Sequence, residues 1–323
     1  MEHKGLRFFS KVTCFSTLLL IFVGGMVTST DSGLSVPDWP LSYGTWFPPM
    51  IGGVFYEHGH RMAASLVGTL ILILSVWLAL KEKRKWLKVL GFAALGSVIC
   101  QGILGGITVL FYLPTPVSVG HAVLAQTLFI LTVIIAYSLS QERQDRQSKK
   151  EDSSQRFLQV VFVLIICVYI QLLIGAIMRH TGSGMAIPDF PTMGGEWFPR
   201  LDEKMLNFVN HWRFDNNLEP VNMNQIVIHL FHRLGALVVL LMVCLVNFAA
   251  FKERKSSGKV IRTIYFLDLL IVLQISLGIL TVLTGKAPVV TSIHVATGAA
   301  TLGFSVLLFL RAAPLSIKNI KLV

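Results

Sequence analysis

Eight long apolar stretches constrain this chain of 323 residues more than any other feature of its sequence. About 20 apolar residues in a helix are needed to cross the ~30 Å hydrocarbon core of a bilayer. Only 14% of the residues are charged, whereas a typical soluble domain carries about 25%. The sequence therefore predicts an all-α integral membrane protein with eight transmembrane helices, at roughly 12–30, 55–80, 89–111, 117–140, 157–178, 223–251, 263–284 and 289–311.

The basic residues predict how these helices are oriented. Most of them fall in five clusters, which lie at residues 4–11, 81–88, 143–156, 252–262 and 311–321. A topology with both the N and C termini in the cytoplasm places every cluster on the cytoplasmic side, as the positive-inside rule predicts. The net charge of +11 is therefore explained by orientation, and it indicates no nucleic-acid partner.

The sequence is internally duplicated. The segment Gly24–Gly33 recurs at Gly175–Gly184 with an offset of 151, and Val36–Pro40 recurs at Ile187–Pro191 with the same offset. Further on the offset is 172 or 173, so the extra residues fall in the second outer loop, around 200–220. We predict two parallel-repeat four-helix bundles, because an even number of spans per repeat preserves the direction of insertion. Their predicted bounds are 1–144 and 145–323, with a polar linker at 141–156.

Four histidines recur at equivalent positions of the two halves. His60 and His121 lie near the outer ends of the second and fourth spans, and His232 and His294 lie near the outer ends of the sixth and eighth. Imidazoles inside a membrane are costly and usually functional. Two of them on alternate helices of one bundle suit axial ligation of a heme iron. A zinc or copper site would favour three or four clustered ligands, and proton or solute transport and hydrogen-bonded core histidines remain alternatives.

The residues beside these histidines differ between the halves. Glu57 precedes His60 by one helical turn, whereas His229 occupies the equivalent position before His232. This difference suggests one site for chemistry and one for electrons, although Glu57 alone would read as an interfacial acid.

An arginine follows one histidine of each half, at Arg61 and Arg233. These arginines are expected to bind heme propionates or to fix the helix end, and snorkelling to the interface is the alternative.

Several motifs together resemble the heme A synthase family, over about residues 16 to 310. They are Gly24-Gly25 with Thr28 and Ser32-Gly33, Pro37-Asp38-Trp39-Pro40, Glu57-His58-Gly59-His60-Arg61, Gln101 with Leu104-Gly105, Arg179-His180-Thr181, His232-Arg233 and His294. Some members of that family carry cysteine pairs in the outer loops. Here Cys14, Cys100, Cys167 and Cys244 all lie in apolar segments, so the chain would belong to a type with cysteine-free outer loops.

The resemblance implies an oxidoreductase that converts the C8 methyl of heme O to a formyl group by successive hydroxylation, giving heme A. It implies that His60, His121 and Arg61 hold the substrate heme, with Glu57 as the catalytic residue near the reacting methyl. It implies that His232, His294 and Arg233 hold a resident heme b for electron transfer.

The resemblance places the chain in the cell (inner) membrane, and the position of the four histidines near the outer ends of their spans places the heme sites toward the outer face. Heme O synthase would be a substrate donor and cytochrome oxidase assembly the product acceptor. Membrane lipid and, in a homo-oligomer, further copies of the chain would be the other partners. A diheme electron-transfer cytochrome is the competing interpretation, followed by a heme transporter. The Glu57/His229 difference favours the enzyme.

Overall fold

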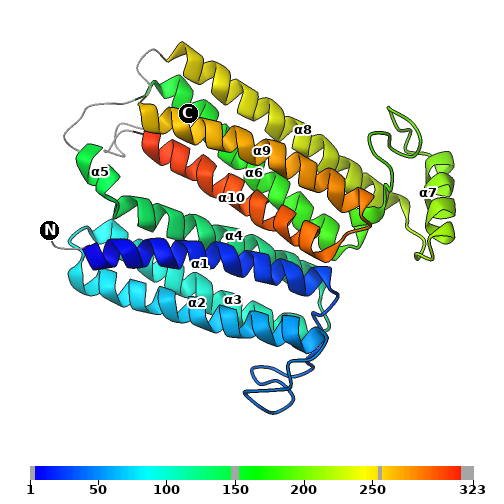
Figure 1. The fold of residues 1–323 in the computed structure, drawn as a ribbon, viewed down its shortest axis with the longest axis horizontal. Coiled ribbons are helices and arrows are strands. Elements are labelled where there is room, and N and C mark those ends of the chain that lie inside the picture. Colours follow the sequence, from blue (N-terminus) through cyan, green and yellow to red (C-terminus); the bar gives the residue numbers. More distant parts are fainter. Residues whose placement is uncertain (1–3, 147–152, 254–256, 314–323) are drawn as a thin grey trace.

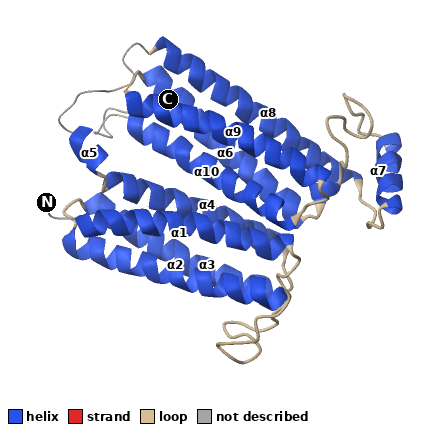
Figure 2. Cartoon of the chain, viewed as in Figure 1, coloured by secondary structure: helices blue, strands red, loops and turns tan. Residues whose placement is uncertain are grey.

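The computed structural model describes residues 4–146, 153–253 and 257–313. Eight of its helices are long and apolar enough to cross a membrane, which confirms the predicted all-α membrane class. They are α1 (Lys4–Ser29), α2 (Gly53–Lys81), α3 (Lys85–Leu110), α4 (Thr115–Ser138), α6 (Gln155–His180), α8 (Met223–Lys252), α9 (Gly258–Leu283) and α10 (Pro288–Ala312). The shorter elements are α5 (Gln141–Arg146), α7 (Glu203–Asp215) and a 3-10 turn at Ser183–Met185. Figure 2 shows helices and loops but no strand among these residues.

The long helices form two groups that lie side by side (Figure 1). Helices α1 to α4 make one group and α6, α8, α9 and α10 the other, and α1 and α4 pack against α6 and α10 between them. Residues 30–52 and 181–222 emerge at the end of the bundle opposite to the N-terminus (Figure 1), and we call this the loop end. The domain boundary near residue 144 stays a prediction.

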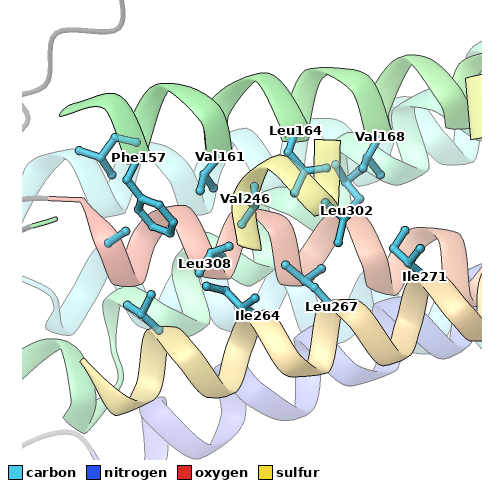
Figure 3. Packing of buried hydrophobic residues seen from close by; sticks show 14 of the residues in the cluster. Phe157, Val161, Leu164, Val168, Val246, Ile264, Leu267, Ile271, Leu302 and Leu308 are labelled. Atoms are coloured by element: carbon cyan, nitrogen blue, oxygen red, sulfur yellow. The ribbon is translucent and has the colours of Figure 1, made fainter. Parts of the chain in front are cut away.

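The apolar core of each group lies in the half of the helices farther from the loop end. In the second group, Phe157, Leu164, Leu267 and Leu308 are fully or almost fully buried against one another (Figure 3). The first group has an equivalent core that includes Leu74. None of the four recurring histidines belongs to these two cores, and all four lie in the half of the helices nearer the loop end.

Two elements differ from the sequence expectations. Helix α1 begins at Lys4 rather than near residue 12, because its polar first turns are anchored at the opposite end from the loops. There the Arg7 guanidinium donates to the Leu139 carbonyl and to the side chains of Gln141 and Gln144. In the linker predicted at 141–156, residues 141–146 are helical, and 147–152 lie outside the described residues.

The extra residues of the second outer loop fold into helix α7. Asp202 caps this helix by accepting a hydrogen bond from the Met205 N–H. Met205 and Val209 are buried against Ile187 and Ile226. Hydropathy reasoning missed α7 because its apolar residues occupy one face of a short, otherwise polar helix.

Candidate functional site

The four recurring histidines all lie about two turns into their helices from the loop end. The rings of His232 (α8) and His294 (α10) are neighbours in an edge-on arrangement, with centroids 6.5 Å apart and planes at 72°. Two imidazoles that share one metal ion would have centroids about 6 Å apart, since each metal–nitrogen bond is about 2 Å long and the centroid lies about 1 Å beyond the nitrogen. The spacing of the His232 and His294 rings therefore matches that of two imidazoles on opposite sides of one metal ion. Within the residues that the structure describes, no group of three or more His, Cys, Asp or Glu side chains is placed to hold a metal.

A glycine of a neighbouring helix lies against the ring of each histidine. A Cβ added at these glycines would meet the Cε1 atom of the paired imidazole: Gly24 with His60 at 3.1 Å, Gly105 with His121 at 3.6 Å, Gly175 with His232 at 3.0 Å, and Gly278 with His294 at 3.1 Å. Three of these distances are shorter than an ordinary van der Waals contact, so an added methyl group would need the ring to move by a few tenths of an ångström. The sequence showed these glycines only as repeat markers, and the structure shows what they have in common.

The ring nitrogens of the two pairs have different partners. In the second half, His232 Nδ1 lies 3.1 Å from the Gln171 side-chain nitrogen, and His294 Nδ1 lies 3.1 Å from the Gln274 carbonyl oxygen. In the first half, the Nδ1 atoms of His60 and His121 are buried and have no hydrogen-bond partner among the described residues. A buried polar atom without a partner is uncommon in a folded protein, so these two nitrogens make the first pair a candidate site.

Glu57 is buried beside the first pair, with 4% of its surface exposed. One carboxylate oxygen accepts a hydrogen bond of 2.7 Å from Arg61, and the other accepts one of 2.8 Å from the Val36 N–H. Arg61 also donates to the carbonyl oxygens of Asp38 and Leu41. Both side chains therefore fix the first outer loop to the end of α2. A propionate-binding role for Arg61 stays a prediction.

His229 makes the equivalent contacts in the second half. Its Nδ1 accepts from the Ile187 N–H at 3.1 Å, and Arg233 Nε lies 3.2 Å from its Nε2. Arg233 also donates to the Ile187 and Asp189 carbonyl oxygens. Val36 and Ile187 are equivalent in the repeat, so the two halves share one loop anchor, built on a carboxylate in one half and on an imidazole in the other.

Two further histidines, His58 and His180, lie at the loop end of the bundle. The Nδ1 atom of His58, which is buried, is 2.8 Å from the Ser42 hydroxyl. His180 ends α6, and its carbonyl oxygen accepts from the Thr115 hydroxyl at the start of α4. Sequence reasoning assigned neither of them a role, and the structure shows that both link a loop or helix end to its neighbour.

The fold defines a polytopic α-helical membrane protein, and each half carries two of the recurring histidines near the loop end. The model of a family described as cytochrome oxidase assembly protein (COX15-CtaA) matches residues 7–53 and 51–306. The chain belongs to this family. It is therefore involved in cytochrome oxidase assembly and in heme chemistry.

Proteins named heme A synthase are similar over much or most of the chain. One from Halalkalibacterium halodurans is 25% identical over 90% of this chain and 92% of its own length. One from Alkalihalophilus pseudofirmus is 32% identical over 62% of this chain and 68% of its own length. A third, from Rhizorhabdus wittichii, is 28% identical over 85% of this chain and 84% of its own length.

Proposed function

We propose that this chain is a heme A synthase, an oxidoreductase that converts the C8 methyl of heme O to a formyl group through successive hydroxylation. Family membership and the names of its relatives support the activity. The observation that carries the division of labour is the repeated histidine pair, accompanied by Glu57 in one half and by His229 in the other.

The second half is proposed to hold a resident heme b. His232 and His294 would hold its iron, which the 6.5 Å separation of their rings supports. Bound there, heme b would supply reversible one-electron transfer. The Gln274 carbonyl oxygen accepts from the ring of His294, and Arg233 holds the second outer loop at the end of α8.

The first half is proposed to bind the substrate heme O through His60 and His121. Glu57 is one helical turn from His60 on the same face of α2. Held by Arg61 and the Val36 N–H, its carboxylate has a fixed position from which it can stabilise positive charge or pass a proton. Arg61 would then serve the reaction by positioning Glu57, whether or not it also meets a propionate.

The distribution of basic residues bears on the orientation of the chain in the membrane. Basic clusters near the end opposite the loops favour cytoplasmic termini, so both heme sites would lie toward the outer face of the cell membrane. Heme O synthase would supply the substrate, and the product would go to cytochrome oxidase assembly. Because the outer loops contain no cysteine, this chain would work without loop thiols, as a member of a cysteine-free type.

Heme extraction tests the activity. Cells that make heme O would be grown with and without this chain, and their extracted hemes separated by chromatography. We expect heme A or its alcohol precursor only when the chain is present. If heme O alone is recovered from cells in which the purified chain carries heme, the chain is a diheme electron-transfer cytochrome instead.

A further inference from the structure

We propose that the first outer loop, residues 30–52, inserts the aromatic tip around Trp46 into the headgroup region of the bilayer. The equivalent tip around Trp197, in the second outer loop, stands in water. Contact with the headgroups would hold the outer end of the first half at one depth in the membrane, because tryptophan favours the membrane–water boundary. This inference rests on the membrane fold and is independent of the proposed heme chemistry.

The two tips are repeats of one structure. In each loop a two-residue turn closed by backbone hydrogen bonds is followed by the recurring sequence Trp-Phe-Pro. In the first loop Trp46 and Phe47 are 67% and 84% exposed. In the second loop Trp197 and Phe198 are 66% and 90% exposed. Both tips therefore present the same aromatic pair, and the residues around them determine which medium each tip contacts.

Charge distinguishes the two tips. The first loop contains no charged residue and no histidine from Trp39 to Tyr56. In the second loop, at the offset of 151, two of these uncharged positions carry charge: Glu196 in place of Thr45, and Arg200 in place of Pro49. Glu196 also forms an exposed ion pair of 3.2 Å with Lys204 of α7. Charged side chains are costly at the membrane, whereas an uncharged segment with exposed aromatic residues suits its interface.

The positions of the loops agree with this difference. In Figure 1 the first loop extends sideways from the loop end of α2, away from the second group, so its tip lies beside the bundle. Helix α7, in contrast, lies beyond the loop end of α8. At its base the first loop adjoins α3, since Trp39 lies against Gly106. Phe55 at the start of α2, and Phe111 and Tyr112 after the end of α3, are exposed as well. The first loop therefore continues the apolar, lipid-facing surface of α2 and α3.

Fluorescence quenching in lipid nanodiscs tests this placement. The full-length chain, Trp46→Phe and Trp197→Phe would be compared in nanodiscs whose lipids carry bromine near the headgroup end of the acyl chains. Both tryptophans are exposed, so neither change disturbs the packing of the chain. We expect Trp46→Phe to remove emission that bromine quenches, and Trp197→Phe to remove emission that dissolved acrylamide quenches. Trp197→Phe is the matched control, because it makes the same change in the equivalent motif.

A charge at the first tip should move it into water. Thr45→Glu copies Glu196 and places a carboxylate next to Trp46. The emission of Trp46, taken as the difference between Thr45→Glu and Thr45→Glu/Trp46→Phe, should lose its quenching by bromine and gain quenching by acrylamide. Equal bromine quenching of Trp46 and Trp197 in the unmodified chain, or a Trp46 emission that Thr45→Glu leaves unchanged, would overturn the inference. No heme is measured, so failure of the proposed function would leave this result as it is.

Discussion

At the scale of single residues, a glycine without a side chain lies against the ring of each of the four recurring histidines. Three glycines leave only 3.0–3.1 Å between a would-be Cβ and the imidazole Cε1, and in Gly105 the same distance is 3.6 Å, an ordinary van der Waals contact. The difference between 3.1 and 3.6 Å decides whether an alanine moves the ring.

A matched pair of variants tests this geometry, because Gly278 and Gly105 are equivalent in the repeat. Gly278→Ala should displace His294 at a cost of about 1–3 kcal/mol, as expected for overpacking, and lower the heme b content of the purified chain. Gly105→Ala should leave both heme b content and heme A yield near those of the unmodified chain. Heme-to-protein ratios measure the effect. Equal ratios for the two variants would show that the glycines do not set the ring positions.

At the scale of elements, each outer loop is organised by one aspartate. Asp38 accepts hydrogen bonds from the N–H groups of Tyr43 and Gly44, and Asp189 accepts from Gly194 and Gly195. This shared turn stands where the Pro-Asp motif recurs in the sequence. The turn is held by the ionised carboxylate, so its stability depends on pH.

The first loop should loosen in acid. The N–H of Gly44, helped by Tyr43 and Arg61, lowers the pKa of Asp38 below its ordinary value of 3.8, while desolvation opposes this shift. A lowered pKa stabilises the folded turn above the unfolded value, and this stabilisation is lost as the pH falls through the lowered pKa. Amide hydrogen exchange at residues 43 and 44, corrected for intrinsic rates, should therefore rise below about pH 4. Asp38→Asn should show the raised exchange already at neutral pH, and full protection in that variant would contradict the role of the carboxylate.

At the scale of the whole molecule, the two halves are joined at the level of the histidines. Arg179 of α6 donates to the Gly25 carbonyl at 2.6 Å and to the Ser29 hydroxyl at 2.7 Å, both on α1. The Ser29 hydroxyl also accepts from Ser292 of α10. This polar contact crosses between the groups α1–α4 and α6–α10, so it couples the end of one bundle to the other.

Removal of this contact should destabilise the assembled chain. Arg179→Met would lose hydrogen bonds from a charged group, worth about 1.5–3 kcal/mol each, and would lower the thermal unfolding temperature in detergent. The comparison is Arg200→Met, at an exposed arginine of the second outer loop. A melting temperature as high as that of the Arg200 variant would show that Arg179 contributes nothing to the union of the halves.

The sequence predicted the eight spans and the recurring histidines because hydropathy and internal repetition are local signals. It could not predict the partners of Arg61 and Arg233, since these lie in loops about 20 and 40 residues away that only the fold brings near. Gln171 was missed for a different reason. Its equivalent at the offset of 151 is Leu20, so a comparison of what the halves share does not mark it, and only the fold places it against His232.

The reduced-minus-oxidised absorbance spectrum of the purified chain and its variants tests directly whether the second half holds a resident heme. We expect His232→Ala or His294→Ala to abolish the b-type heme signal, whereas Glu57→Gln and His60→Ala should retain it but yield no heme A. A signal that survives loss of His232 or His294, or that disappears equally with Glu57, would contradict the assignment of a resident heme to the second half.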